Sequence, residues 1–183
     1  MNKKKKVFVF LPDGVGLRNF AFTKFKEIGE SAGFDIYYWN NTSFTLHESL
    51  GFKEIIIDND QLHPLTPLYS RARKRIELNI SRDKFKDGVY PTYKFPLNYK
   101  GLKNALKSTF ISILIKLYSS EKGLERIRRK INSMERKNPK YQYCKTQLQN
   151  HKPELVFCTT QRSTQSISAL LAANDLGIPT VAF

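Results

Sequence analysis

Cysteine and histidine are scarce in this chain, and their spacing excludes the common metal sites. The 183 residues include two cysteines and three histidines. Neither Cys144 nor Cys158 has the cysteine or histidine neighbours of a zinc site, and the histidines are scattered along the sequence. Cys158 lies in an apolar run that predicts a buried strand, where a free thiol behaves as a small apolar residue. We therefore predict no metal, and we expect a cytoplasmic protein because that compartment is reducing.

Long apolar runs are also missing. The longest late run, 110–118, is interrupted by Lys116 and falls far short of the roughly 20 residues that span a bilayer. Lysines at positions 3–6 resemble the charged part of a signal peptide, but the apolar stretch after them, 7–11, stops at Pro12. From the sequence we expect neither secretion nor a membrane span.

The glycine loop after this first apolar stretch lacks the third glycine of the dinucleotide-binding fingerprint. Gly14 and Gly16 form only G-V-G, and no acidic residue closes the second expected strand. NAD binding is therefore disfavoured, and we predict no cofactor. The two glycines suit either a plain turn or a loop that approaches a ligand, with positive φ or close backbone approach. Asp13, Arg18 and Asn19 in the same loop favour a ligand, because a turn does not require them.

Strand and helix patterns alternate at both ends of the chain. The run 7–11 is continuously apolar, as expected for a strand buried on both faces of a parallel sheet. Helical spacing then places Phe22, Phe25 and Ile28 on one face of a helix, and Gly177 caps a later helix. The expected strands are 7–11, 34–39, 53–58 (closing on Asp58, Asn59 and Asp60), 153–158 and 179–183, and the expected helices are 20–33, 46–50 and 163–176. This order predicts an α/β fold with a Rossmann-like open parallel sheet and flanking helices.

Positive charge is concentrated between these two blocks. The chain has 31 Lys and Arg against 16 Asp and Glu, and residues 70–145 hold 21 and six of them. This segment therefore carries the whole formal charge of +15, while the rest of the chain is neutral. Helical patterns dominate it, so we predict a basic, mostly helical insertion at about 70–145 within a single Rossmann-like domain spanning 1–183.

Three interpretations of the basic segment stay open. Its charge runs at 71–75 and 126–130 are typical of solvated helix faces. A nucleic-acid partner would bind the same positive charge, but no recognised nucleic-acid-binding motif is present. We therefore do not expect a nucleic-acid partner. An anionic membrane surface is the third, because the stretch 101–118 can form a helix with one apolar face that inserts shallowly. That face, which suits packing against the sheet equally well, consists of Leu102, Leu106, Phe110, Ile113 and Leu117.

Three segments resemble the amino-terminal half of a GT-B glycosyltransferase. They are V-F-L-P-D-G-V-G-L-R-N-F at 9–20, K-P-E-L-V-F-C-T-T-Q-R-S at 152–163 and G-I-P-T-V-A-F at 177–183. The resemblance covers roughly 6–60 and 152–183. It implies two Rossmann-like domains that face each other across a cleft, the first holding the acceptor and the second the nucleotide-sugar donor. Because the chain ends inside an apolar strand, we expect it to be the acceptor-side half alone, inactive without its donor domain.

The resemblance and the topology predict the same site. If the strand order is 3-2-1-4-5, ligands bind outside the carboxyl ends of the first and fourth strands, where the order reverses. Several GT-B enzymes carry a histidine base in the first loop, and Asp13 is the only residue here that could replace it. Asp13 is thus the predicted catalytic base of an inverting transfer, with a capping role as the alternative. The predicted substrate-binding residues are Gly14, Gly16, Arg18, Asn19, Thr159, Thr160, Gln161 and Arg162, the last being otherwise a surface residue.

The resulting hypothesis is a glycosyltransferase domain that takes part in surface glycan synthesis. Its expected partners are a nucleotide-sugar donor, held by the missing domain, and a glycan or lipid-linked acceptor. The basic segment 70–145 suggests a peripheral position at the inner face of the cytoplasmic membrane. The alternatives are a nucleotide- or phosphate-ligand binding domain, such as a sugar-nucleotide epimerase half, and a basic nucleic-acid-binding protein.

Overall fold

The computed structural model describes residues 4–57, 61–161 and 163–183. The chain divides into two compact units: residues 1–62 with 135–183 form an α/β unit, and residues 63–134 form a helical unit. The helical unit begins and ends earlier than the insertion that the charge pattern places at about 70–145.

The α/β unit is built on an open parallel sheet. Within the described residues it contains β1 (Lys5–Leu11), β2 (Phe34–Asn40), β3 (Glu54–Ile56), β4 (Leu155–Cys158) and β5 (Thr180–Ala182). Their order is β3-β2-β1-β4-β5, and each neighbouring pair is parallel. The predicted fold class and strand order are therefore confirmed. The polar residues expected to close the third strand, 58–60, lie outside the described residues.

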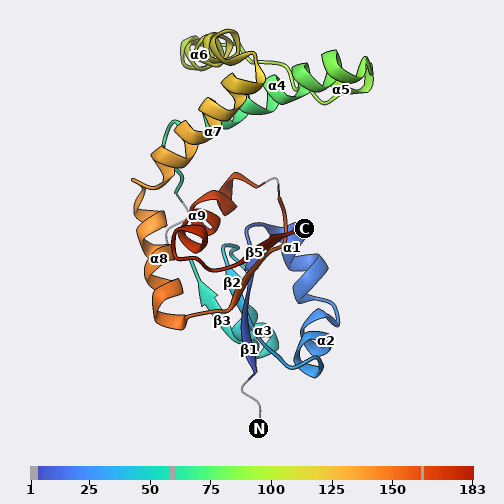
Figure 1. Ribbon diagram of the computed structural model, residues 1–183, viewed down its shortest axis with the longest axis vertical. Helices are drawn as coiled ribbons and strands as arrows, with labels where there is room; N and C mark the ends of the chain where they lie inside the picture. The colour runs from blue at the N-terminus through green and yellow to red at the C-terminus, as the bar shows by residue number, and fades with distance from the viewer. Residues whose placement is uncertain (1–3, 58–60, 162) are drawn as a thin grey trace. The chain divides into compact units, whose positions relative to one another are not determined.

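Helices cover both faces of this sheet (Figure 1). Alternate residues of β1 point into two separate cores: Phe8 and Phe10 pack with side chains of α8 and α9, whereas Val7, Val9 and Leu11 pack with η1, α2 and α3. Both sides of β1 are buried, as its continuous apolar run predicts. The helices of this unit are α1 (Gly14–Gly16), the π-helical η1 (Leu17–Ala21), α2 (Phe25–Ser31), α3 (Leu46–Leu50), α8 (Pro139–His151), the 3₁₀ turn η2 (Thr164–Ser166) and α9 (Ile167–Asp175).

The prediction for the first helix is wrong in its start and in part of its buried face, although Phe25 packs against the core as predicted. Helical structure begins at Gly14, passes through η1, and is interrupted before α2. Phe22 and Ile28, expected on the apolar face, are 51% and 65% exposed. Leu17 and Ala21 are buried instead, because the wider π-helical turn changes which side chains face the sheet.

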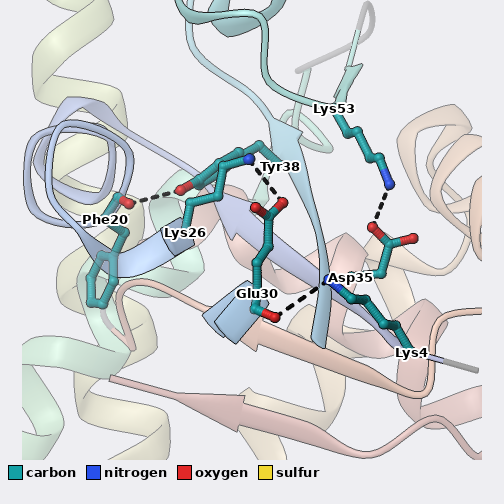
Figure 2. A network of polar contacts seen from close by, with 7 residues as sticks. All are labelled: Lys4, Phe20, Lys26, Glu30, Asp35, Tyr38 and Lys53. Atoms are coloured by element: carbon teal, nitrogen blue, oxygen red, sulfur yellow. Dashed lines mark hydrogen bonds and ion pairs between the residues drawn. The ribbon is translucent and has the colours of Figure 1, made fainter. Parts of the chain in front are cut away.

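Polar contacts hold η1 against β2, and others lie along α2 (Figure 2). The Tyr38 hydroxyl donates to the carbonyl oxygen of Phe20 at 2.8 Å, which fixes the end of η1 over the sheet. Burial, and then the charge of Glu30, raise the pKa of Tyr38. On α2 itself, Lys26 pairs with Glu30 at 2.8 Å. A partly exposed ion pair of this kind adds little stability, so the hydrogen bond of the buried tyrosine is the stronger of these links.

The helical unit consists of α4 (Thr66–Phe85), α5 (Val89–Thr92), α6 (Leu102–Tyr118) and most of α7 (Glu121–Glu135). Its own core joins α4, α6 and α7 through Ile76, Ile111 and Ile127 among others. An ion pair of 2.8 Å between Arg128 and Glu77 also links α7 to α4. The basic segment is therefore mostly helical, as predicted. In the part of the chain that the structure describes, no helix has both the length and the apolar character needed to cross a bilayer.

Candidate functional site

The loops after β1 and β4 meet at the carboxyl edge of the sheet. The backbone of Gly16 lies so close to Thr159 that a Cβ atom at position 16 would stand 2.1 Å from Thr159 Oγ1. Thr159 is buried, and its hydroxyl donates to the carbonyl oxygen of Phe10 at 3.0 Å. Two of the predicted site residues are thus in contact. Position 16 requires glycine because the Thr159 side chain occupies the space that a larger residue would need.

Asp13 caps the short helix that follows β1. Its Oδ1 accepts hydrogen bonds from the backbone N–H groups of Val15 and Gly16, each at 3.1 Å. Among the described residues no hydrogen bond is made to Oδ2. Asp13 is half-buried, and the two N–H bonds of the cap hold its carboxylate in one orientation. The positive φ expected for Gly14 and Gly16 is not found, because the Asp13 cap starts the helix at Gly14 and both glycines are helical.

Arg18 and Asn19 lie on η1, one helical turn beyond the cap. Both side chains are exposed, and Arg18 Nε donates to Asn19 Oδ1 at 3.3 Å. The guanidinium therefore has further N–H donors directed to solvent, which suits an anionic group such as a phosphate. Arg162, the other predicted arginine, lies outside the described residues.

The loop after β4 is held by hydrogen bonds to the end of β5 and to Cys158. The backbone N–H of Gln161 donates to Phe183 O at 3.0 Å, and its side-chain amide donates to Ala182 O at 3.2 Å. Thr160 is half-buried, and its carbonyl oxygen accepts the thiol of Cys158 at 3.1 Å. Gln161 thus fastens the loop to the end of β5, in addition to lying at the predicted edge.

The thiol of Cys158 lies beneath this edge and is not set up as a nucleophile. Burial raises its pKa, and the negative charge of Asp13 raises it further. A thiol with a raised pKa is protonated at neutral pH and reacts slowly. No group of three or more His, Cys, Asp or Glu side chains that could hold a metal ion is found within the described ranges.

A buried lysine lies at the same edge, and sequence reasoning missed it. Lys140 is fully buried, and its Nζ donates to Asn41 Oδ1 at 2.9 Å and to Gln165 Oε1 at 2.8 Å. Asn41 follows β2 and Gln165 lies in η2, so the ammonium group joins two carboxyl-end loops. Burying an ammonium group costs free energy unless the group is hydrogen-bonded. The hydrogen bonds to Asn41 and Gln165 therefore stabilise Lys140 in this buried position.

Glu135 is a second fully buried charged residue beside this one in the sequence. Its Oε2 accepts the Ser168 hydroxyl at 2.8 Å and lies 3.5 Å from Asn138 Nδ2. Asn138 also caps α8 by accepting the Lys140 N–H at 3.1 Å, and it donates to Gln61 O at 2.8 Å. The charge pattern places the run 135–140 in the basic insertion. Asn-Pro before Lys140 signals a helix start, but nothing in the sequence signals the burial of either charge.

An ion pair fixes α9 beside this group. Arg136 contacts both carboxylate oxygens of Asp175, at 2.7 and 2.8 Å, and the Tyr141 hydroxyl donates to the same carboxylate at 2.8 Å. The hydrogen bond from Arg136 is the main cause that lowers the pKa of Asp175 to about 2. This contact holds α9, and with it η2, in place at the edge.

Away from this edge, the described residues also line surface hollows, of which two stand out. One of about 420 Å³ lies at the amino end of the sheet between Lys6, Asp35, His151 and Glu154, and its walls carry both signs of charge. The other, of about 40 Å³, lies in the helical unit between α4 and the segment 93–95. We place the candidate site at the carboxyl edge instead, because open parallel sheets bind ligands where the strand order reverses.

Comparison with protein-family models, with curated proteins and with solved structures found no match to this chain.

Proposed function

We propose that the chain is the acceptor-side domain of a glycosyltransferase, which binds a glycan or lipid-linked acceptor for transfer from a nucleotide sugar. The observation that carries this proposal is the strand order β3-β2-β1-β4-β5, which puts Gly16, within the segment 13–19, against Thr159 where the order reverses. Open α/β sheets bind ligands at this point. The resemblance of the two loop segments to GT-B enzymes supplies the reaction class.

The side chains at this edge have the chemistry that an inverting transfer needs. The acceptor oxygen attacks the anomeric carbon, its proton passes to Asp13 Oδ2, and the nucleoside diphosphate leaves from the opposite face of the sugar. The two N–H bonds to Oδ1 hold the carboxylate in one orientation during this step. Arg18 binds a phosphate of the acceptor through its solvent-facing N–H donors, and Asn19 binds a sugar hydroxyl.

Asp13→Asn separates a catalytic role from a capping role. Asparagine caps helices about as well as aspartate, so the melting temperature should change little, whereas the base is lost. A general base accelerates a reaction roughly 10²–10⁴-fold. Turnover by a protein that contains both the acceptor and the donor domain should fall by that factor. The assay measures nucleoside diphosphate released from a panel of nucleotide sugars in the presence of extracted membrane lipids and glycans.

Asp13→Ala and Arg18→Ala complete the test. Asp13→Ala removes the cap as well, so it should lower both stability, by about 1 kcal/mol, and turnover. Arg18→Ala should raise KM for phosphate-bearing acceptors with the fold intact. Full turnover in Asp13→Asn would remove Asp13 as the base, and an intact protein that releases no nucleoside diphosphate with any sugar would reject glycosyl transfer.

A further inference from the structure

Helix α6 (labelled in Figure 1) has an apolar face on the side away from its own core. Ile111 and Leu114 are buried and pack with α4 in the core of the helical unit. At roughly 100° per residue, the opposite side of the helix carries four large aliphatic side chains within about 60° of arc. These four, called the α6 stripe, are Leu102 (80% exposed), Leu106 (64%), Ile113 (48%) and Leu117 (71%).

The α6 stripe is exposed although its residues favour burial. Complete burial of one leucine or isoleucine is worth about 1.5–3 kcal/mol, so four on one line form a surface that gains from being covered. Contiguous apolar surfaces of this kind mark sites of protein or membrane interaction. Within the helical unit the stripe is uncovered, because α6 packs on α4 through its other side.

The positive charge around the stripe favours an anionic partner. Residues 63–134 hold 17 Lys and Arg against five Asp and Glu, a net formal charge of +12, and α6 itself has three lysines and no acidic residue. On the helical wheel Lys103 and Lys116 border the stripe on its two sides, each about 40° beyond the last aliphatic position. Both lysines are exposed, so their ammonium groups can reach outward while their methylene stems lie along the apolar face.

We propose that the α6 stripe docks on an anionic lipid bilayer, with α6 lying parallel to the membrane surface. Such a surface supplies both partners at once: acyl chains for the aliphatic side chains, and phosphate groups for the bordering lysines. Each lysine close to an anionic leaflet contributes about 1 kcal/mol. A second copy of this chain would bring a charge of +12 against +12, and a nucleic acid would leave the aliphatic side chains uncovered.

This docking surface uses no residue of the carboxyl edge, so the test of membrane docking does not depend on the test of glycosyl transfer. The test is flotation of the 183-residue chain with vesicles of phosphatidylcholine, alone or with about 30% phosphatidylglycerol, an anionic content in the range that attracts basic segments. We expect binding to the anionic vesicles and weak binding to the neutral ones. Added salt should weaken binding, because it screens the lysine contribution.

Matched variants separate the stripe from general electrostatics. Leu106→Ser with Leu117→Ser should reduce vesicle binding about tenfold or more, with helical content unchanged because both side chains are exposed. Phe85→Ser, which removes an apolar side chain that is 60% exposed outside the stripe, should leave binding unchanged. Lys103→Glu with Lys116→Glu should weaken binding far more than the same charge change at Lys84 and Lys86.

Insertion can be measured directly with Leu117→Trp. Its emission should shift to the blue and be quenched by brominated acyl chains in anionic vesicles, against a constant background from the fully buried Trp39. The proposal is overturned if the double leucine variant binds as well as the parent, or if both double lysine variants lose equal affinity. It is also overturned if the chain binds an oligonucleotide but no vesicle, or self-associates through the stripe without binding lipid.

Discussion

Replacing Gly16 by alanine tests whether the two loops of the candidate site are packed as described. The backbone at Gly16 is helical, with φ −59° and ψ −43°, so alanine is compatible with the local conformation. In an open helix this change stabilises by about 0.5–1 kcal/mol. Here the new methyl group would stand 2.1 Å from Thr159 Oγ1 and 3.0 Å from Thr159 Cβ. The Thr159 side chain must therefore rotate or shift.

The cost follows from what Thr159 loses. Rotation of its side chain breaks the buried hydrogen bond from Oγ1 to Phe10 O, worth about 1 kcal/mol. That carbonyl keeps the bond from the Thr159 N–H at 3.1 Å, so no acceptor is left unsatisfied. Overpacking adds about 1–3 kcal/mol. After subtraction of the helix gain, Gly16→Ala should lower the free energy of unfolding by about 1–3 kcal/mol.

Trp39 provides the assay, because it is the only tryptophan and lies fully buried in the α/β unit. Its fluorescence in a urea titration reports the unfolding of that unit. Gly14→Ala is the matched control: among the described residues, no heavy atom beyond its chain neighbours and its own helix backbone lies within 4 Å of the added Cβ, so it should be neutral or slightly stabilising. Thr159→Ala in the Gly16→Ala background should recover part of the loss. Equal stability of Gly16→Ala and Gly14→Ala would refute the packing of the two loops.

Three further outcomes follow from the buried charges and thiols. Lys140→Ala should destabilise the α/β unit by about 2–4 kcal/mol in the same urea assay, because two amide oxygens lose their donor, whereas exposed Lys137→Ala should stay within about 0.5 kcal/mol. Asp175 has its pKa lowered to about 2 from an ordinary 3.8, so its carboxylate stabilises the fold above the ordinary value and this contribution is lost as the pH falls toward 2. Asp175→Asn should flatten the loss of stability across that acid range, and an unchanged acid profile would contradict the Arg-paired carboxylate. Burial raises the pKa of Cys144 to about 12 and also raises that of Cys158, so iodoacetamide should label neither thiol in native protein at neutral pH, while mass spectrometry after denaturation shows both labelled.

The fold was predictable because its signals are local. The continuous apolar run at 7–11 belongs to a strand buried on both faces, and Gly177, with φ +69°, ends α9 as the pattern indicates. The phase of the first helix was not predictable, since a π-helical turn at 17–21 leaves no mark in apolar spacing. The burial of Lys140 was not predictable for a different reason. It depends on Asn41 and Gln165, which are distant from Lys140 in the sequence.

The candidate site was predictable in position but not in contacts. Strand order alone brings 13–19 and 159–163 to one edge. Whether Gly16 faces a ligand or Thr159, and whether Asp13 is free or capping, depends on distances that spacing does not encode. Likewise, the apolar face of 101–118 is visible in the sequence, but which side of that helix packs on α4 is a property of the folded unit.

The way the sheet is assembled has a consequence for synthesis on the ribosome. Thr159 bonds to Phe10 across 149 residues, and β1 pairs with β4, so β4 and β5 can join the sheet only after the helical unit has been synthesised. The helical unit, by contrast, is continuous in the sequence and has its own core. It should fold first, while β1 still presents an open edge. Because such long-range pairing is slow, the nascent protein is most prone to aggregation, and most in need of a chaperone, between the completion of the helical unit and the arrival of β4.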